Sequence, residues 1–259
     1  MSIMLSKAKN KLFNSLSHKK FRDELNLFTA EGDKLVTDLL GHFDCKYLVA
    51  EQKWIDNLTA NKYSFIDQAE IIIADSKEEI KKISTLNTPS PVFAVFTQPK
   101  HKTTRDISSS SQMILALDTI QDPGNMGTII RTADWFGIKD IICSYATADV
   151  FNPKVVQSSM GAIANVNISY CELKSTISEL KKDRWHVYGT LLNGKNIYKS
   201  QPDKTKAILI MGNEGKGISE PLIELIDTPL LIPSSGNPIS DSMNVAIATA
   251  ITLSEFFRN

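Results

Sequence analysis

The sequence predicts an α/β protein whose C-terminal part is built on a mostly parallel, doubly wound sheet. Apolar runs typical of buried strands alternate with helix-like patterns along most of the chain. The run Met113–Leu117 is apolar throughout, as expected for a parallel strand covered on both faces. Loops rich in glycine, asparagine and proline follow three such runs. Because open α/β sheets bind ligands at the carboxyl ends of their strands, we expect these loops to form one site.

Length and composition limit the possible classes of protein. The 259 residues can form one or two domains, and 29 basic residues balance 29 acidic ones. This balance argues against a uniformly basic nucleic-acid coat, but not against a local basic patch. Cys45, Cys143 and Cys171 form no CxxC pair or even framework, so we expect buried thiols and neither zinc nor disulfides. No apolar run approaches the ~18 residues of a membrane span, and no signal peptide is visible, which favours the cytoplasm.

Residues 1–98 are predicted to form a small α/β domain. Ser76 and Glu79 have the spacing of a capping box at a helix start. The expected elements are helices over 6–26, 34–40, 51–58 and 76–83, and strands at 27–30, 47–50, 70–74 and 91–96. Residues 99–111 carry basic residues and four consecutive serines without apolar periodicity, so this segment is predicted to be a linker. The linker is a solvated tether, or it lies against a polyanion.

Residues 112–259 are predicted to form the second domain. Gly137 is expected to end its first helix as a C′ residue, and Pro221 to lie in the first turn of a later one. The expected strands are 113–117, 140–143, 166–170, 186–190, 207–211 and 230–233, and the expected helices are 125–136, 153–160, 173–182, 219–226 and 242–257.

Three loops of this domain contain the candidate site, and common motifs do not explain them. They are 122–131, 211–217 and 232–244. The glycine-rich loop 212–217 is not a P-loop because Ile218 follows Gly217, and no G-x-G-x-x-G follows the first strand of either domain. None of the four histidines lies in a candidate loop, which disfavours Ser-His-Asp hydrolysis, and no carboxylate cluster indicates a metal.

The loops instead offer backbone groups and a few polar side chains. Glycines at the 212–217 loop allow close approach of a ligand, and two such loops could line a slot for a flat base. Asn125 is expected near a helix N-cap, with Arg131 about two turns further on. A simpler interpretation makes Arg131 an i,i+3 ion-pair partner of Asp134. Glu214 could likewise be only a turn residue, and Ser242 and Asn244 only an N-cap and its neighbour.

Taken together, the three loops resemble the signature motifs of the SpoU (TrmH-type) RNA ribose methyltransferases of the SPOUT superfamily. The matching segments are Asp122–Gly127 with Arg131–Ala133, Gly212–Ser219, and Ile232–Pro233 with Ser242–Ala246; residues 154–162 also resemble a family segment. The segments 22–24 and 31–36 are similar to the substrate-binding domain that precedes many such enzymes, a small ribosomal-protein-type RNA-binding fold. The resemblance covers nearly the whole chain.

The resemblance implies a deep trefoil knot in the second domain, S-adenosylmethionine bound in the knot, and a homodimer formed through it. No metal and no membrane are expected. The residues that match catalytic positions are Asn125, Arg131, Glu214, Ser242 and Asn244. Those that match the cofactor-binding segments are Gly212, Asn213, Gly215, Ile232 and Met243.

The sequence departs from the family pattern in places that concern the RNA-facing rim. The third motif contains the extra stretch 234–241, Met243 stands where leucine is common, and 156–158 lacks a frequent arginine. A basic stretch at the N-terminus, free of acidic residues, is the candidate RNA surface; the alternative is a solvated helix face. Its members are Lys7, Lys9, Lys11, Lys19, Lys20 and Arg22.

The expected activity is methylation of a ribose 2′-hydroxyl in structured RNA. Large-subunit rRNA is favoured, because the N-terminal domain resembles the rRNA-modifying branch and the chain lacks the additional terminal helices frequent in tRNA enzymes. Two alternatives remain: a tRNA 2′-O-methyltransferase, and an RNA-binding or assembly protein that has lost catalysis.

Overall fold

The computed structural model describes residues 5–99, 112–236 and 242–258, and its contacts divide the chain into two compact units. The first unit contains the residues up to 100 together with 149–164, and the second contains 101–148 and 165–259. Most of the predicted linker, 100–111, lies outside the described residues. Residues 149–164 thus belong by their contacts to the first unit, although strands of the second unit precede and follow them in the chain.

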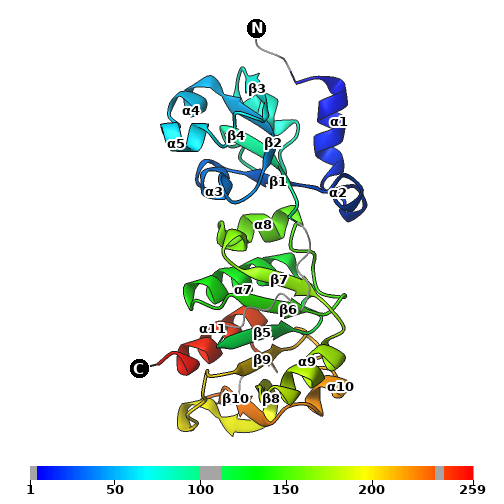
Figure 1. Cartoon of the computed structure of the whole chain (residues 1–259), viewed down its shortest axis with the longest axis vertical. Coiled ribbons are helices and arrows are strands. Elements are labelled where there is room, and N and C mark those ends of the chain that lie inside the picture. Colours follow the sequence, from blue (N-terminus) through cyan, green and yellow to red (C-terminus); the bar gives the residue numbers. More distant parts are fainter. Residues whose placement is uncertain (1–4, 100–111, 237–241, 259) are drawn as a thin grey trace. The chain divides into compact units, whose positions relative to one another are not determined.

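The first unit is built on a four-stranded sheet in the order β1-β4-β2-β3 (Figure 1). Strand β4 is antiparallel to β1 and β2, whereas β2 and β3 are parallel. The strands are β1 (Leu27–Glu31), β2 (Cys45–Glu51), β3 (Glu70–Ala74) and β4 (Val92–Thr97). The helices are α1 (Lys7–Ser15), α2 (Lys19–Leu25), α3 (Asp33–Leu39), α4 (Gln52–Asp56), α5 (Ala60–Tyr63), α6 (Lys77–Lys81) and α8 (Pro153–Ser159), followed by the 3₁₀ turn η2 (Ala162–Ala164).

Apolar side chains cover both faces of this sheet. Phe13 and Leu16 from the α1 region pack with Phe93 and Val95 on one face. On the other, Phe28 stacks on Phe96 with ring centroids 5.5 Å apart, and its centroid lies 4.8 Å from that of Phe151. Residues 149–164 therefore add an aromatic side chain to the core of the first unit.

The predicted continuous helix over 6–26 is wrong, because α1 ends at Ser15 and α2 begins at Lys19. The hydroxyls of Ser15 and Ser17 donate to the carbonyls of Leu12 and Asn14, and His18 is extended. Serine side chains that bond to the local backbone compete with helical hydrogen bonds, which explains a break at this position. The one-turn helix α5 was not predicted, because a single turn carries no apolar periodicity.

The predicted capping box at Ser76 is only partly present. The Ser76 side chain makes no cap hydrogen bond to α6. Glu79 does reach back to the backbone, accepting from the N–H groups of Asp75 and Leu5. The carboxylate thus supports the helix start and the N-terminal segment without the reciprocal serine bond.

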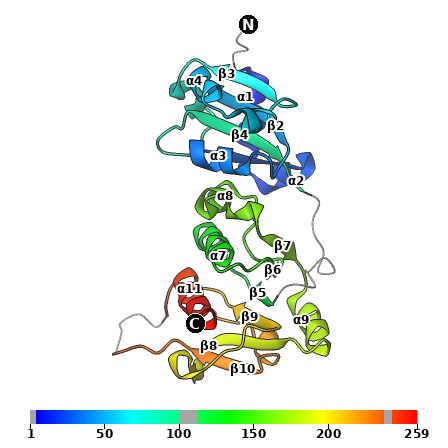
Figure 2. The ribbon, with the colours of Figure 1, turned by 60° about the vertical axis from the view of Figure 1, so that its left-hand side comes forward.

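The second unit is a six-stranded sheet in the order β10-β8-β9-β5-β6-β7, with parallel pairing throughout (Figure 2). Its strands are β5 (Met113–Leu117), β6 (Asp140–Cys143), β7 (Asn167–Tyr170), β8 (His186–Asn196), β9 (Ala207–Met211) and β10 (Thr228–Leu231). Its helices are α7 (Pro123–Trp135), α9 (Leu173–Lys182), α10 (Glu220–Ile223) and α11 (Val245–Phe256), with the 3₁₀ turn η3 (Ile197–Lys199).

Helices lie on both faces of this sheet: α7 and α11 on one side, α9 and α10 on the other (Figures 1 and 2). Ile114, Ile208 and Ile210 pack against α9 and α10 side chains in one core cluster. The central strands β5 and β9 are buried at every residue, as expected for parallel strands covered on both faces. The predicted α/β class with a mostly parallel sheet and a small N-terminal domain is confirmed.

The cysteines are free and buried. Burial raises the pKa of the Cys45 thiol to about 12, and burial also raises the pKa of Cys143. These thiols therefore stay protonated at neutral pH and act as small core residues. No helix in the described parts of the chain has the length and hydropathy needed to cross a membrane.

Candidate active site at the carboxyl ends of the parallel strands

Asn125 joins the three candidate loops through hydrogen bonds. Its Nδ2 donates to Glu214 Oε1 at 3.0 Å, and its Oδ1 accepts from Asn244 Nδ2 at 2.9 Å. Asn125 lies in the first turn of α7, Glu214 follows β9, and Asn244 precedes α11. Residues separated by 89 and 119 positions in the chain thus meet at one point, as the carboxyl-end argument predicted.

Each of these side chains is positioned by its helix or turn. Asp122 is the N-cap of α7 and accepts from the Asn125 backbone N–H at 2.8 Å. Asn244 is the N-cap of α11, and its Oδ1 accepts from the N–H groups of Ala246 and Ile247. Sequence reasoning offered capping as the alternative to a site role for Asn244. The structure shows that one side chain does both, since the carbonyl caps the helix and the amide nitrogen reaches Asn125.

The loop 213–217 is a closed turn organised by Asn213. Reciprocal backbone bonds of 3.0 and 2.9 Å join Asn213 and Gly217. The Asn213 side chain accepts from the N–H groups of Gly215 and Lys216 and donates to the carbonyl of Thr119 at 2.8 Å. This preformed turn holds half-buried Glu214 towards Asn125 while Gly215 and Lys216 remain exposed.

The structural role of Gly212 differs from the role that the sequence suggested. We expected it to admit a ligand, but a Cβ there would lie 2.3 Å from the backbone atoms Gly217 C and Ile218 N. Gly212 is buried, and its missing side chain lets the loop close on itself. A ligand at this edge would instead meet the exposed part of the turn.

Arg131 and Ser242 are described but are not part of the Asn125 hydrogen-bond group. Arg131 is exposed on α7, two turns after the helix start, and it forms no hydrogen bond or ion pair with a described residue. The alternative Arg131–Asp134 ion pair is therefore not formed. Ser242 is exposed two residues before the α11 cap, and residues 237–241 of the third loop lie outside the described residues.

The residues suggested for cofactor binding flank this group. Asn213 and Gly215 are in the closed turn, Ile232 is half-buried just after β10, and Met243 is 47% exposed directly before Asn244. The site therefore offers uncharged amide and backbone groups together with apolar side-chain surface. That mixture suits a nucleoside with a flat base, which needs few charged partners.

Sequence reasoning missed two residues that support the site. The buried Asp118 accepts from the Ser219 N–H at 2.8 Å. Thr119 has a left-handed backbone (φ 59°) and donates its N–H to Ser144 Oγ, while its carbonyl holds Asn213. A signal was available, because two polar residues directly follow the fully apolar strand Met113–Leu117. The sequence around these two residues did not show that they hold the segment 213–219 in place.

The basic N-terminal residues are placed in two groups. Lys7, Lys11, Lys19 and Lys20 are exposed, although Lys19 and Lys20 form i,i+4 pairs with Asp23 and Glu24. Lys9 is partly buried, pairs with Glu70 and lies 4.8 Å from the Tyr47 ring centroid.

Arg22 is 1% exposed, so it presents no free guanidinium to an RNA. It donates to Asp149 Oδ2 and to the carbonyls of Leu16 and Ser17. A buried charge needs such partners, and this arginine is a structural residue of the first unit.

The second unit is an α/β domain with its polar site at the carboxyl ends of parallel strands, the class of protein that binds a nucleotide-like ligand at that edge. Residues 112–254 match the SpoU rRNA Methylase family, and residues 7–94 match the MRM3-like substrate binding domain. The chain therefore belongs to the SpoU rRNA methylase family, and the family predicted from the three motifs is confirmed.

Similar proteins support this assignment over nearly the whole chain. The chain is 32% identical over 252 residues to the 23S rRNA (guanosine(2553)-2′-O)-methyltransferase RlmP of Bacillus subtilis (strain 168), covering 95% of this chain and 96% of that protein. A TrmH-family RNA methyltransferase structure from Porphyromonas gingivalis matches with a TM-score of 0.87, 39% identity and 99% coverage of both chains. An AdoMet-bound rRNA methyltransferase from Sinorhizobium meliloti matches with a TM-score of 0.84 and 31% identity, covering 100% and 97%.

Proposed function

We propose that this enzyme transfers a methyl group from S-adenosylmethionine to a ribose 2′-hydroxyl of structured RNA, with large-subunit rRNA as the substrate. The observation that carries the proposal is the joining of Asn125, Glu214 and Asn244 at the carboxyl edge of the sheet. The family match and the AdoMet-bound relative support the cofactor, and the rRNA-modifying relative supports the substrate.

When bound, S-adenosylmethionine would supply a methyl group on a positively charged sulfur. The ribose 2′-oxygen donates an electron pair to the methyl carbon, the carbon–sulfur bond breaks to leave a neutral thioether, and the hydroxyl proton is released to solvent. Such a reaction is favoured by orientation and by exclusion of water more than by strong acid–base groups. Asn125, Glu214, Ser242 and Asn244 orient the ribose through hydrogen bonds. The closed 213–217 turn, Ile232 and Met243 hold the adenosyl group.

Arg131 is proposed as a clamp on the phosphate next to the target ribose. Arginine side chains keep their proton in proteins, so a role as general base is unattractive. A guanidinium can bind a phosphate through two parallel bonds and stabilise the negative charge that the 2′-oxygen carries as its proton leaves. Its exposure and lack of a protein partner among the described residues leave its donors available for RNA.

We also propose a homodimer formed through the knotted second unit; the knot itself stays a prediction. Exposed apolar side chains support the dimer: Trp135 on α7 is 86% exposed, and Ile247 on α11 is 55% exposed. The helices α7 and α11 pack against each other, so these side chains belong to neighbouring elements of one unit. Large exposed apolar groups of this kind are typical of interfaces.

The deciding experiment is methyl transfer from labelled S-adenosylmethionine to unmodified total rRNA and total tRNA, side by side, followed by mapping of ribose methylation. Label at one 2′-O position of large-subunit rRNA is the expected result, and Arg131→Ala is the control variant with strongly reduced transfer. Label only in tRNA would support the proposed reaction but show that the substrate is tRNA and not rRNA. Cofactor binding without label in either RNA would favour the binding or assembly protein, and absence of cofactor binding would overturn the proposal.

A further inference from the structure

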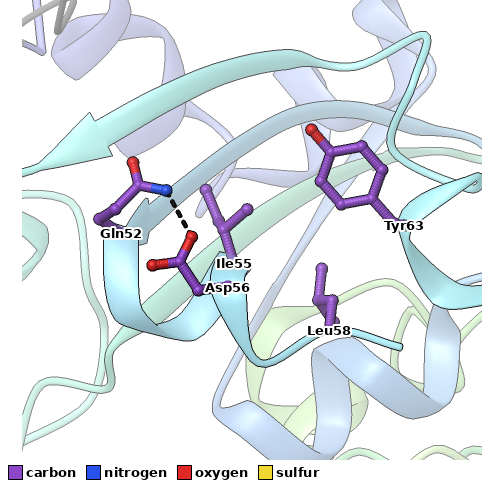
Figure 3. A pocket seen from close by; sticks show the side chains of 5 residues that line it. All are labelled: Gln52, Ile55, Asp56, Leu58 and Tyr63. Atoms are coloured by element: carbon purple, nitrogen blue, oxygen red, sulfur yellow. Dashed lines mark hydrogen bonds between the residues drawn. The ribbon is translucent and has the colours of Figure 1, made fainter. Parts of the chain in front are cut away.

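A pocket of about 510 Å³ lies in the first unit, apart from the residues of the proposed reaction. It is formed by α4, α5 and the connection between them, and its lining consists of Gln52, Ile55, Asp56, Leu58 and Tyr63. In Figure 3 the Tyr63 ring stands on one side, the Gln52 and Asp56 side chains on the other, and Ile55 and Leu58 lie between them. The pocket thus combines an apolar floor, an aromatic wall and a polar wall.

The polar wall is rich in hydrogen-bond acceptors. Gln52 Nε2 donates to Asp56 Oδ1 at 2.8 Å, which fixes both side chains on one face of α4 (Figure 3). This bond leaves the second carboxylate oxygen of Asp56 and the carbonyl oxygen of Gln52 to accept from a ligand. A complementary ligand presents N–H groups, such as the amino and imino groups on the edge of a nucleobase.

The aromatic wall is accessible to a ligand. Tyr63 is 45% exposed, whereas Ile55, which also lines the pocket, is 7% exposed and Leu58 is half-buried. A half-exposed tyrosine ring in a pocket that is also lined by less exposed aliphatic side chains offers a face on which a nucleobase can stack.

We propose that this pocket binds one unpaired nucleobase of the substrate RNA, stacked on Tyr63 with its N–H-bearing edge towards Gln52 and Asp56. The inference rests on the proposed function in that it takes RNA as the substrate. Recognition of RNA by protein commonly uses bases that have left the helical stack, held between aromatic rings and side-chain amides or carboxylates. The pocket would then select RNA that carries an unpaired base able to enter it.

The charge near the pocket is compatible with RNA. Asp56 carries a negative charge, but Lys53 on α4 and Lys62 on α5 lie on the same two helices. Lys62 Nζ donates to the Leu40 carbonyl at 2.9 Å, and this hydrogen bond holds it in place. These lysines offset the repulsion between Asp56 and the phosphates that flank a bound base.

The test uses a short transcript of large-subunit rRNA, chosen as the fragment that the wild type binds most tightly. Tyr63→Ala should raise the Kd of this transcript about five- to a hundredfold, the range expected for losing one stacked base. Tyr63→Phe, which keeps the ring, should bind like the wild type. Phe65→Ala is the matched control, because Phe65 is 46% exposed and two residues away but does not line the pocket. The Kd for S-adenosylmethionine should be unchanged in all three variants.

An abasic scan of the same transcript identifies the base. At one position, removal of the base should weaken binding to the wild type but not to Tyr63→Ala, since the partner ring is already gone. If every abasic position weakened binding equally in the wild type and in Tyr63→Ala, the proposed base binding would be refuted. Equal Kd values for Tyr63→Ala and Phe65→Ala would refute it as well. A loss of binding to ribosomal particles without a loss for the protein-free transcript would assign the pocket to a protein partner instead.

These outcomes are separate from those of the proposed reaction. If the wild type transfers methyl groups and Tyr63→Ala behaves like Phe65→Ala, only the base pocket fails. If the wild type binds the large-subunit RNA in a Tyr63-dependent manner but transfers no methyl group, only the proposed reaction fails.

Discussion

At the scale of single residues, substitution of Arg131 can separate the effect of the planar guanidinium group from the effect of its positive charge. Arg131→Lys keeps the positive charge but loses the planar fork that can hold a phosphate by two bonds. We expect kcat to fall at least about tenfold in Arg131→Lys, and about 10²- to 10³-fold in Arg131→Ala, the range seen when one charge-stabilising donor is removed. Single-turnover methyl transfer at saturating RNA measures this step.

Arg258→Lys is the matched control for this prediction. Arg258 is also exposed and pairs with Glu255 at 3.3 Å, but it follows the end of α11. Its substitution should leave kcat unchanged. Wild-type kcat in both Arg131 variants would refute the phosphate clamp.

The Arg22–Asp149 ion pair predicts a large effect on stability. Asp149→Ala leaves the buried guanidinium with only two carbonyl partners. Breaking one partner of a buried pair costs about 3–5 kcal/mol, so the free energy of unfolding should fall by that amount. Urea denaturation followed by circular dichroism measures it. Asp23→Ala removes the exposed Lys19 pair instead and should cost under about 1 kcal/mol; equal losses would show that the buried pair has no special weight.

Residues differ in how far the sequence could predict them. Asn125, Glu214 and Asn244 were predictable because their motifs follow parallel strands, and strand ends on one edge must meet. Arg22 was misassigned to the RNA surface because a charge run predicts a solvated face, and its partner Asp149 lies 127 positions away. A contact at that separation leaves no local trace in a single sequence.

At the scale of elements, the N-terminus of α11 links stability to activity through one side chain. Asn244→Asp keeps an oxygen to cap the helix but loses the amide that donates to Asn125. Asn244→Ala loses both interactions. We expect Asn244→Asp to keep wild-type stability with reduced kcat, and Asn244→Ala to lose activity and about 1 kcal/mol of stability.

Thermal unfolding and methyl transfer on the same preparations test the Asn244 pair. Stability losses of equal size in both variants would mean that the amide, and not the cap, holds the helix start. Unreduced activity in Asn244→Asp would remove the Asn125–Asn244 bond from the mechanism.

Helix α1 presents two cations that RNA can use without first breaking an ion pair. Lys7 and Lys11 are exposed and one turn apart, whereas Lys19 and Lys20 on α2 pair with Asp23 and Glu24. The double substitution Lys7→Ala/Lys11→Ala should reduce the slope of log K against log salt concentration by about 1.5 to 2, as expected for two lost phosphate contacts. Filter binding from low to moderate salt measures this slope.

The matched control is Lys19→Ala/Lys20→Ala, which removes the same formal charge from α2. Its effect on the slope should be smaller, because each of these lysines already pairs with a carboxylate. Equal slopes for the wild type and the α1 double variant would exclude α1 as an RNA contact.

Element boundaries show where sequence patterns lose information. Helix α9 and strand β3 have the predicted bounds, since apolar periodicity and flanking polar residues agree there. Strand β8 continues to Asn196, well past the predicted end at Thr190. Its extension pairs with β10 after a register shift between Pro229 and Leu230. Pairing of that kind depends on a distant strand, so the polar residues and glycine at 193–196 gave no local sign of it.

At the scale of the whole molecule, the exposed apolar side chains of α7 and α11 predict the oligomeric state. Trp135→Glu introduces a charge at an 86% exposed ring, which a monomer would tolerate but a buried interface would not. We expect this variant to sediment as a monomer where the wild type is a dimer. Tyr145→Glu is the control, because Tyr145 is 75% exposed but follows β6 and is not on either helix.

Sedimentation velocity over a range of concentrations distinguishes the two states. A monomeric wild type would refute the dimer, and a dimeric Trp135→Glu variant would move the interface away from the end of α7. Methyl transfer by the monomeric variant would show in addition whether one copy is sufficient for catalysis.

The order in which the chain is made has a consequence for the buried arginine. During synthesis, Arg22 emerges long before Asp149, which is the first of the sixteen residues 149–164 that complete the first unit. At about 5–20 residues per second, the ribosome needs on the order of several seconds to pass from residue 100 to residue 164. Throughout that interval the nascent N-terminal fold holds a guanidinium without its carboxylate. We therefore expect the nascent N-terminal fold to remain accessible to chaperones until residues 149–164 have been synthesised.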